Sequence, residues 1–316
     1  MSPTRRILVL GAGELGTAIA TSLLSHPAYD VSTTSLTFVV RPATLKSLES
    51  GSATDRTKAL ETFRTKGVLF AAADLVADSE QSLAELFRKY NIVIHAGAMT
   101  LPEGTQLKVT RSALAAGVDE YIPWQWGVDY DAIGKSGGLG LFAEQCDVRN
   151  LLRAQSTTKW FILSCGVFMS FLFEDFWGVV VRNEQGEING VRALGALDHN
   201  ITASTVEGIA RCNAELVLVD TQERNKAVYI ACDTMRYDEF ADLIERVVGR
   251  EVKRDVWTTD WLREQAEKEP EDKLWKYRVV FSEDIGLAWG LKGTYNERKG
   301  IGMEGIEAYM RRLEMR

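Results

Sequence analysis

The first half of the chain alternates short apolar runs with segments in which apolar residues recur every three or four positions. The spacing of Leu83, Leu86 and Phe87, for example, predicts one face of a helix. The apolar runs predict buried strands at residues 7–10, 36–40, 67–70, 91–97 and 121–122. Strands that are apolar throughout and alternate with helices are typical of a parallel sheet covered on both faces. The pattern therefore predicts an α/β fold with a doubly wound parallel sheet.

The second half of the chain has a less regular pattern. Strands are predicted at residues 161–164 and 227–232, and residues 237–248 have the spacing of an amphipathic helix. From Trp257 onward the chain is charged and carries several tryptophans, which indicates short helices and loops. We expect a sheet domain at 1–165 and a smaller C-terminal region at 166–316, with the strand at 227–232 returning to the sheet.

The first predicted strand ends in a Gly-x-Gly-x-x-Gly turn that leads directly into a helix. In a turn of this kind Gly11 makes the sharp bend, Gly13 lets the backbone approach a pyrophosphate, and Gly16 lets the helix pack on the strand. Glu14 and Leu15 begin the helix, whose N-terminus faces the phosphates. Such a turn also occurs without a ligand. The second strand follows at the distance of a βαβ unit, however, which favours a bound dinucleotide in a Rossmann-type domain.

The second predicted strand ends at Arg41, where domains that prefer NAD usually carry an Asp or Glu. A guanidinium matches a 2′-phosphate in charge and geometry and can also stack on adenine, so Arg41 favours NADP(H). The alternative is a solvated surface arginine. Asp74, which follows the third strand, is expected at the adenine edge of the cofactor.

Composition argues against several classes of protein, among them proteins that bind nucleic acids, metals or membranes. The chain has 316 residues, 46% of them hydrophobic, and its net charge of −7 argues against a nucleic acid partner, because phosphate binding requires a basic face. Four cysteines without a Cys-x-x-Cys pair and three scattered histidines indicate neither a metal site nor a disulfide framework. The apolar stretches fall short of the ~20 residues of a membrane span, and the first of them is a strand. We therefore expect no membrane contact and a cytoplasmic protein.

Residues 123–127, Pro-Trp-Gln-Trp-Gly, resemble the Pro-Ser-Glu-Phe-Gly segment of the isoflavone reductase-like and NmrA-like proteins, a group of atypical short-chain dehydrogenases. Other matching pieces follow in order along the chain: the glycine turn, Arg41, Gln106 at the start of a helix, and residues 142–149, 201–210 and 237–240. The resemblance extends to about Trp261. It implies that Gln106, Pro123 and Trp124 lie against the cofactor and that the region 166–316 binds substrate.

Two positions depart from the family pattern. Leu10 stands where the family's turn usually carries a further glycine, and Gln145 stands where its reductases carry a lysine near the substrate. An amide can donate a hydrogen bond to a carbonyl but cannot deliver a proton near neutral pH. Tyr130 and Lys135, in a glycine-rich loop, are further candidates for a catalytic role; the alternative for both is a solvated loop residue.

Aromatic and apolar side chains gather after the fifth and sixth strands. We expect Trp126, Phe168 and Met169 to line a substrate pocket, because such a lining suits a flat or apolar ligand. The alternative for the segment 166–177 is the core of a domain interface.

Two functions fit these residues. The first is an NADPH-dependent reductase of a small aromatic or polyketide-like specialised metabolite, which transfers hydride to an enone, iminium or carbonyl carbon. The second, implied by the NmrA-like resemblance, is a non-catalytic sensor that binds NAD(P)(H) and reports its redox state to a protein partner. The aromatic lining favours the reductase, and the absence of the lysine favours the sensor.

Overall fold

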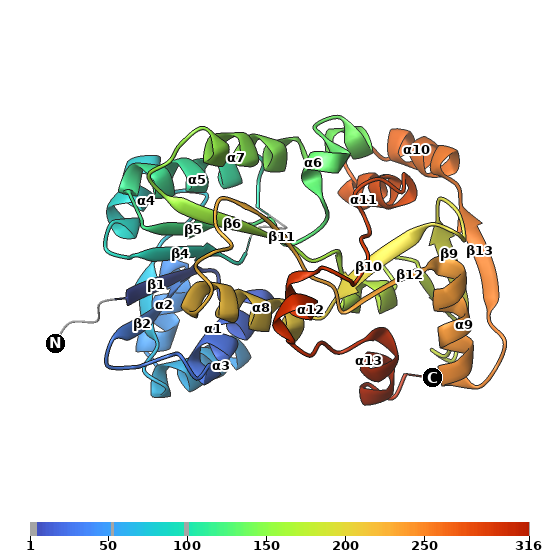
Figure 1. Ribbon diagram of the computed structural model, residues 1–316, viewed down its shortest axis with the longest axis horizontal. Coiled ribbons are helices and arrows are strands. Elements are labelled where there is room, and N and C mark those ends of the chain that lie inside the picture. Colours follow the sequence, from blue (N-terminus) through green and yellow to red (C-terminus); the bar gives the residue numbers. More distant parts are fainter. Residues whose placement is uncertain (1–4, 52–53, 98–100, 316) are drawn as a thin grey trace. The chain divides into compact units, whose positions relative to one another are not determined.

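A seven-stranded sheet organises the N-terminal half of the computed structural model, which describes residues 5–51, 54–97 and 101–315 (Figure 1). Its order is β11-β6-β5-β4-β1-β2-β3. The strands are β1 (Arg5–Leu10), β2 (Thr34–Val40), β3 (Leu69–Ala72), β4 (Ile92–His95), β5 (Glu120–Ile122), β6 (Lys159–Ser164) and β11 (Lys226–Tyr229). Neighbouring strands from β6 to β3 are all parallel. The predicted Rossmann-type doubly wound fold is thus confirmed.

Helices cover both faces of this sheet (Figure 1). One face carries α4 (Glu80–Phe87), α5 (Thr105–Ala116) and α7 (Ala143–Arg153); the other carries α1 (Glu14–Ser25) and α8 (Val206–Leu218), while α2 (Pro42–Glu49) and α3 (Asp55–Thr65) connect β2 to β3. Phe87, Val109 and Leu152 from the first three helices pack with sheet residues in one buried cluster. Burial on both faces explains why the central strands are apolar throughout.

The third strand differs from its prediction. The sequence predicts a buried strand at 67–70, whereas β3 covers Leu69–Ala72 and Leu69 is 57% exposed. Gly67 has a φ of +84° and belongs to the turn before the strand, a backbone conformation that glycine adopts easily. Because β3 is the outer strand of the sheet, it is covered less than the central strands.

The remaining strands form two three-stranded sheets, with the orders β12-β10-β7 and β13-β9-β8. They are β7 (Val167–Phe168), β8 (Val180–Arg182), β9 (Ile188–Leu194), β10 (Asn200–Ser204), β12 (Asp233–Arg236) and β13 (Lys253–Trp257). Short helices accompany them: α6 (Tyr130–Ile133), α10 (Thr259–Lys268), α11 (Lys273–Ser282), α12 (Tyr295–Lys299), α13 (Ile306–Arg312) and the 3₁₀ turns η1 (Gly137–Gly140) and η2 (Met169–Phe173). The apolar pattern of the sequence predicts none of these six strands.

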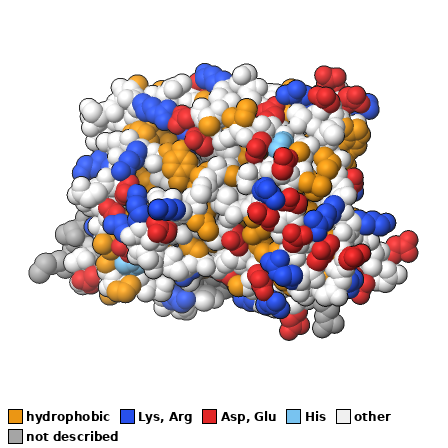
Figure 2. All heavy atoms as spheres, turned by 45° about the vertical axis from the view of Figure 1, so that its right-hand side comes forward, with side chains coloured by type: hydrophobic (Ala, Val, Ile, Leu, Met, Phe, Trp, Pro, Cys, Tyr) orange, Lys and Arg blue, Asp and Glu red, His pale blue; other side chains and the backbone are white. Residues whose placement is uncertain are grey.

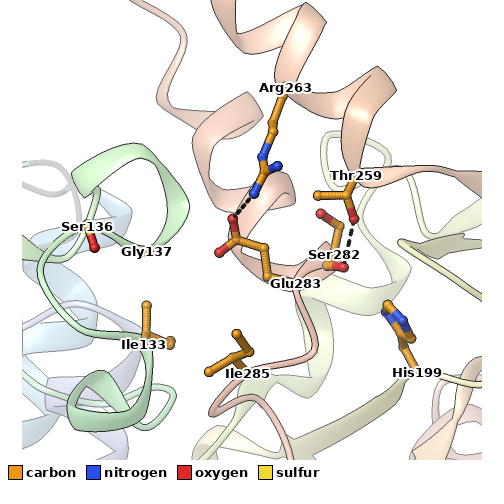
Figure 3. A pocket seen from close by; sticks show the side chains of 9 residues that line it. All are labelled: Ile133, Ser136, Gly137, His199, Thr259, Arg263, Ser282, Glu283 and Ile285. Carbon is orange, nitrogen blue, oxygen red and sulfur yellow. Dashed lines mark hydrogen bonds and ion pairs between the residues drawn. The ribbon is translucent and has the colours of Figure 1, made fainter.

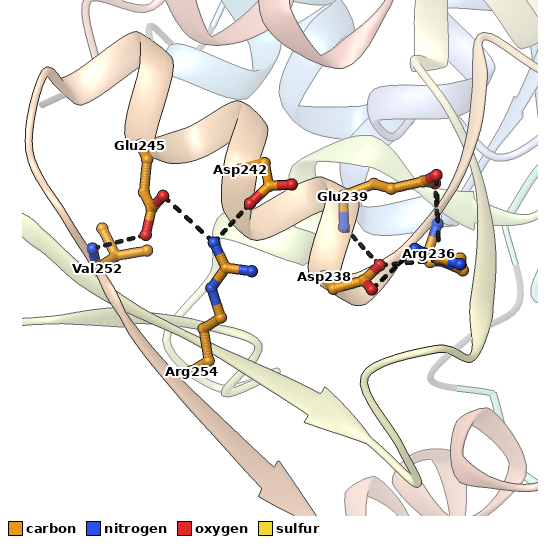
Figure 4. Close-up of polar contacts among 7 residues, drawn as sticks. All are labelled: Arg236, Asp238, Glu239, Asp242, Glu245, Val252 and Arg254. Carbon is orange, nitrogen blue, oxygen red and sulfur yellow. Dashed lines mark hydrogen bonds and ion pairs between the residues drawn. The ribbon is translucent and has the colours of Figure 1, made fainter.

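The amphipathic helix expected at 237–248 is α9 (Tyr237–Val248). Its apolar side, which includes Phe240, is buried in the core of this region. On its polar side Arg254 of β13 pairs with Asp242 at 2.5 Å and with Glu245 at 3.2 Å (Figure 4). These ion pairs attach β13 to α9 across the exposed edge.

The chain forms two compact units that interleave along the sequence. The first unit comprises Met1–Gln125, Asp147–Ile162 and Asn213–Ala227, and the second comprises Trp126–Cys146, Leu163–Cys212 and Val228–Arg316. The continuous division into 1–165 and 166–316, with a cofactor domain and a substrate region, stays a prediction. β11 takes its place in the sheet beside β6.

Among the described residues, no helix is long and apolar enough to cross a membrane. No group of three His, Cys, Asp or Glu side chains in this part of the chain lies close enough together to hold a metal ion. All four cysteines are buried and outside any disulfide. On the face seen in Figure 2 acidic and basic side chains are intermixed. That face therefore differs from the basic surface that binding to a nucleic acid backbone requires.

Candidate functional site

Two glycines of the turn after β1 are required by the packing of the protein itself. Gly11 has a φ of +100°, and a Cβ at this position would lie 3.3 Å from the Cα of Gly97, so the turn bends closely past the end of β4. A Cβ at Gly16 would overlap the carbonyl oxygen of Gly11. Their absent side chains let α1 begin directly against the turn.

Gly13 has no such requirement. Its φ of −86° is accessible to any residue, and a Cβ there would meet no atom within 4 Å. Gly13 is the N-cap of α1 and adds no side-chain hydrogen bond to the first turn. Leu15 turns its side chain into the core, while Gly13 and Glu14 are exposed. The turn thus leaves open space at a helix N-terminus, a position that fits a pyrophosphate.

Arg41 and Asp74 lie beside each other at the carboxyl ends of β2 and β3, where the N–H of Ala73 donates to the carbonyl of Val40. Asp74 accepts hydrogen bonds from the backbone N–H groups of Ala77 and Val76, and these bonds, helped by the nearby charge of Arg41, lower its pKa. Asp74 therefore organises its own turn as a carboxylate. Arg41 is exposed, and its side chain forms no hydrogen bond or close ion pair with any described residue.

Gln106 is the second residue of α5 and is buried. Its side-chain oxygen has no hydrogen-bond partner among the described residues. Buried amide oxygens are nearly always paired, so an unpaired one is a place where a ligand donor fits. A hydroxyl or amide N–H of a dinucleotide would supply that donor.

The segment after β5 is held from α7. Pro123 is buried and Trp124 is half-buried. Gln125, also buried, accepts a hydrogen bond of 2.8 Å from Nε of Arg149, whose side chain is fully buried. The sequence alone does not reveal this contact, because the two residues are separated by 24 positions. The pair fixes the backbone that carries Trp124.

His95, at the end of β4, is fully buried, and burial lowers its pKa to about 4. Its ring is consequently neutral near pH 7. This state agrees with a structural histidine and makes His95 unsuited to acid catalysis.

The three candidates for catalysis lie in different environments. Gln145, on α7, and Tyr130, the first residue of α6, are both buried, while Lys135 is exposed in the loop that follows. The ring of Tyr130 packs edge-on against Phe142, with 4.7 Å between centroids. Its hydroxyl lies against Gly127, where any side chain would collide with it. The structure gives Tyr130 a place in the core, and the catalytic role of all three stays a prediction.

The residues expected to line a substrate pocket differ in how deeply they are buried. Trp126 and Met169 are buried, and Met169 belongs to the apolar core of the second unit. Phe168 is half-buried and packs against Phe171, with 5.7 Å between ring centroids. Of the three, Phe168 keeps the ring surface that a ligand could contact. Their assignment to a substrate remains a prediction.

The fold and the glycine turn together define a Rossmann-type protein. The model of the NmrA-like family matches residues 3–285, and the chain belongs to that family, as the resemblance in the sequence indicates. An NmrA-like family domain-containing oxidoreductase of Gibberella moniliformis (strain M3125 / FGSC 7600) is 38% identical over 311 residues, which cover 98% of each chain.

Solved structures share the fold at lower identity. An isoflavone reductase has a TM-score of 0.77 with 17% identity and covers 99% of this chain and 100% of its own. AtPrR2, solved with NADP+ and (+)pinoresinol, has a TM-score of 0.75 with 18% identity and covers 98% of this chain and 99% of its own. At these identities the likeness concerns the fold.

Proposed function

We propose that this protein is an NADPH-dependent reductase of a small aromatic or polyketide-like metabolite. The observation that carries the proposal is the open space beside Gly13 at the N-terminus of α1. Neither the packing around Gly13 nor its backbone conformation requires a glycine there. The naming of the Gibberella relative as an oxidoreductase supports it, as does the presence of NADP+ in AtPrR2.

The residues of the first unit divide the binding of NADPH among them. Gly13 and the N-terminus of α1 hold the pyrophosphate, Arg41 pairs with the 2′-phosphate, and Gln106 accepts a hydrogen bond from a ribose hydroxyl or the carboxamide. Asp74 keeps the turn beside Arg41 in place. Bound nicotinamide supplies the hydride.

Gln145 sets the class of substrate. A ketone needs a proton at the developing alkoxide, and a general acid typically contributes 10²–10⁴-fold. Gln145 can hold an oxyanion by a hydrogen bond but has no proton to give near neutral pH. Addition of hydride to an iminium ion, or to the β-carbon of an enone, requires less from an acid. We therefore place conjugated enones and iminium ions ahead of simple ketones.

The test measures NADPH consumption with matched panels of aromatic enones, iminium ions and ketones. We expect the first two classes to be reduced faster, and Gln145→Ala to lower kcat without shifting any pKa in its pH profile. Rapid reduction of ketones would contradict the substrate class. In that case Tyr130→Phe and Lys135→Met identify the acid by the loss of most of the rate.

The second candidate function is a redox sensor, and the observation that favours it is Gln145 at the lysine position. A sensor would bind NADPH and NADP+ without turnover, and a protein partner would distinguish the two forms. NADPH binding without consumption by any member of the panel, together with partner binding that depends on the oxidation state of the cofactor, would decide for the sensor.

A further inference from the structure

A pocket of about 600 Å³ lies within the second unit, apart from every residue assigned to the cofactor (Figure 3). Ile133 of α6 and the adjoining Gly137 form one side. Arg263 of α10 and Glu283, directly after α11, form another, and His199 closes the pocket before β10. The volume is in the range of small-molecule sites, which are typically about 300–1,000 Å³.

The polar side of the pocket contains an ion pair. In Glu283, Oε1 lies 2.9 Å from Nη2 of Arg263, and Oε2 accepts the backbone N–H of Gly138 at 3.2 Å. The side chain of Arg263 makes no other hydrogen bond among the described residues and is 48% exposed. Since Glu283 is already paired, the remaining N–H groups of the guanidinium suit an anionic oxygen.

His199 adds a further donor. Its Nδ1 is buried without a hydrogen-bond partner among the described residues, and the ring lies against Gly195, where a Cβ would collide with it. A buried N–H without an acceptor is rarer than an unpaired lone pair, so we assign the proton to Nε2. Nε2 then presents an N–H on the side of the ring that is not buried.

The rest of the pocket is apolar. Ile285 lines it and is 53% exposed, so its side chain is open to a ligand. Figure 3 shows Ile133 opposite Ile285, with the Arg263–Glu283 pair above them. A ligand that covered both isoleucines would remove apolar surface from water.

We propose that this pocket binds a small organic carboxylate with an apolar body. The carboxylate pairs with Arg263 and His199, and the body lies between Ile133 and Ile285. The bound molecule joins the segment 133–137 to the elements that carry Arg263 and Glu283. The inference stands on residues of the second unit alone and is independent of the proposed reductase activity.

Calorimetric titration of the full-length protein with phenylacetate tests the proposal, with phenylacetamide and 2-phenylethylammonium as neutral and cationic analogues. We expect phenylacetate to bind at least tenfold more tightly than either analogue. Arg263→Gln should weaken phenylacetate binding about tenfold. Arg312→Gln is the matched control, because Arg312 pairs with Glu304 at 2.8 Å and is also 48% exposed. That variant should bind phenylacetate like the wild type.

Ile285→Ser provides a second variant at an exposed position, where folding is at little risk. It should weaken phenylacetate binding severalfold while the melting temperature stays unchanged. Equal affinity for phenylacetate and phenylacetamide, or the same loss in Arg263→Gln and Arg312→Gln, would overturn the carboxylate assignment. Absence of phenylacetate binding in a wild-type protein that binds NADPH would overturn this inference alone.

Discussion

Individual side chains decide the preference for a cofactor in this fold. Arg41 directly follows β2 and Asp74 lies just beyond the end of the neighbouring β3, yet only one of the two side chains is available to a ligand. Asp74 is committed to the N–H groups of Ala77 and Val76, whereas the side chain of Arg41 is exposed and has no partner among the described residues. Under the proposed function, the positive charge of Arg41 faces the adenosine ribose.

Replacing Arg41 by Gln should weaken NADPH binding about 10- to 100-fold and leave NADH binding unchanged, because a charge-assisted pair contributes roughly 1.5–3 kcal/mol. Calorimetric titration of both cofactors measures the difference. Arg88→Gln, at another exposed arginine of the first unit, is the control. A variant that still preferred NADPH tenfold would show that Arg41 does not contact the 2′-phosphate.

Gly13 and Gly16 offer a paired experiment three residues apart. Gly13→Val places a side chain in open space and should abolish NADPH binding at a cost of less than about 1 kcal/mol in folding stability. Gly16→Val forces a side chain into the backbone of Gly11 and should cost about 2 kcal/mol or more. Chemical denaturation and NADPH titration separate the two effects. Full NADPH affinity in Gly13→Val would remove the basis of the proposed function.

Among the helices and strands, the sequence predicts those whose formation depends on neighbouring residues. The strand at 7–10, the turn after it and the helix at 237–248 were all predictable, because apolar period and glycine placement lie within a few residues of each other. The short strands β7 and β12 were not, since each pairs with β10, which is distant in sequence. The strand β8 was not predicted either, although it forms a hairpin with the adjacent β9. The contact of Gln125 with Arg149 and the pocket around Arg263 could not be predicted either, because they bring together residues that are far apart in the sequence.

A buried ion pair joins the end of α8 to the sheet. Arg224 lies 2.9 Å from Glu120 of β5, stacks over Phe161 and donates to the carbonyl of Leu216. Burial outweighs this pairing and raises the pKa of Glu120 from 4.5 to about 7. The folded state therefore holds a proton that the unfolded state releases between these pH values.

The sign follows from this difference in bound protons. The contribution of Glu120 to stability is greatest below about pH 4.5 and falls as pH rises toward 7, by up to about 3 kcal/mol. Glu120→Gln keeps an acceptor for Arg224 and removes the titration. Melting temperatures between pH 5 and 8 should therefore fall less in Glu120→Gln than in the wild type. Parallel curves for the two proteins would contradict the raised pKa.

At the scale of the whole molecule, the chain continues beyond the family match, which ends at residue 285. This final segment is attached to the second unit. Asp233 accepts the N–H of Ile306 at 2.7 Å at the start of α13, and Tyr309 stacks on Phe173 with 5.7 Å between centroids. The tail is therefore part of the folded unit.

Asp233→Ala should free the N-terminus of α13 and cost about 1–2 kcal/mol. Limited proteolysis should then cut near residues 300–306 faster than in the wild type, while NADPH affinity stays the same because Asp233 belongs to the second unit. Asp238→Ala is the control, because it loses an ion pair with Arg236 and a hydrogen bond from the N–H of Glu239, neither of which involves α13. Equal cutting of all three proteins would show that Asp233 does not anchor the tail.

The interleaving of the two units has a consequence for how such a chain can evolve. The backbone passes from one unit to the other after Gln125, Cys146, Ile162, Cys212 and Ala227. No single break in the gene separates them, so neither half can be exchanged with another protein by simple recombination. A change of specificity in a chain of this kind is therefore expected to arise through point substitutions and changes in loop length.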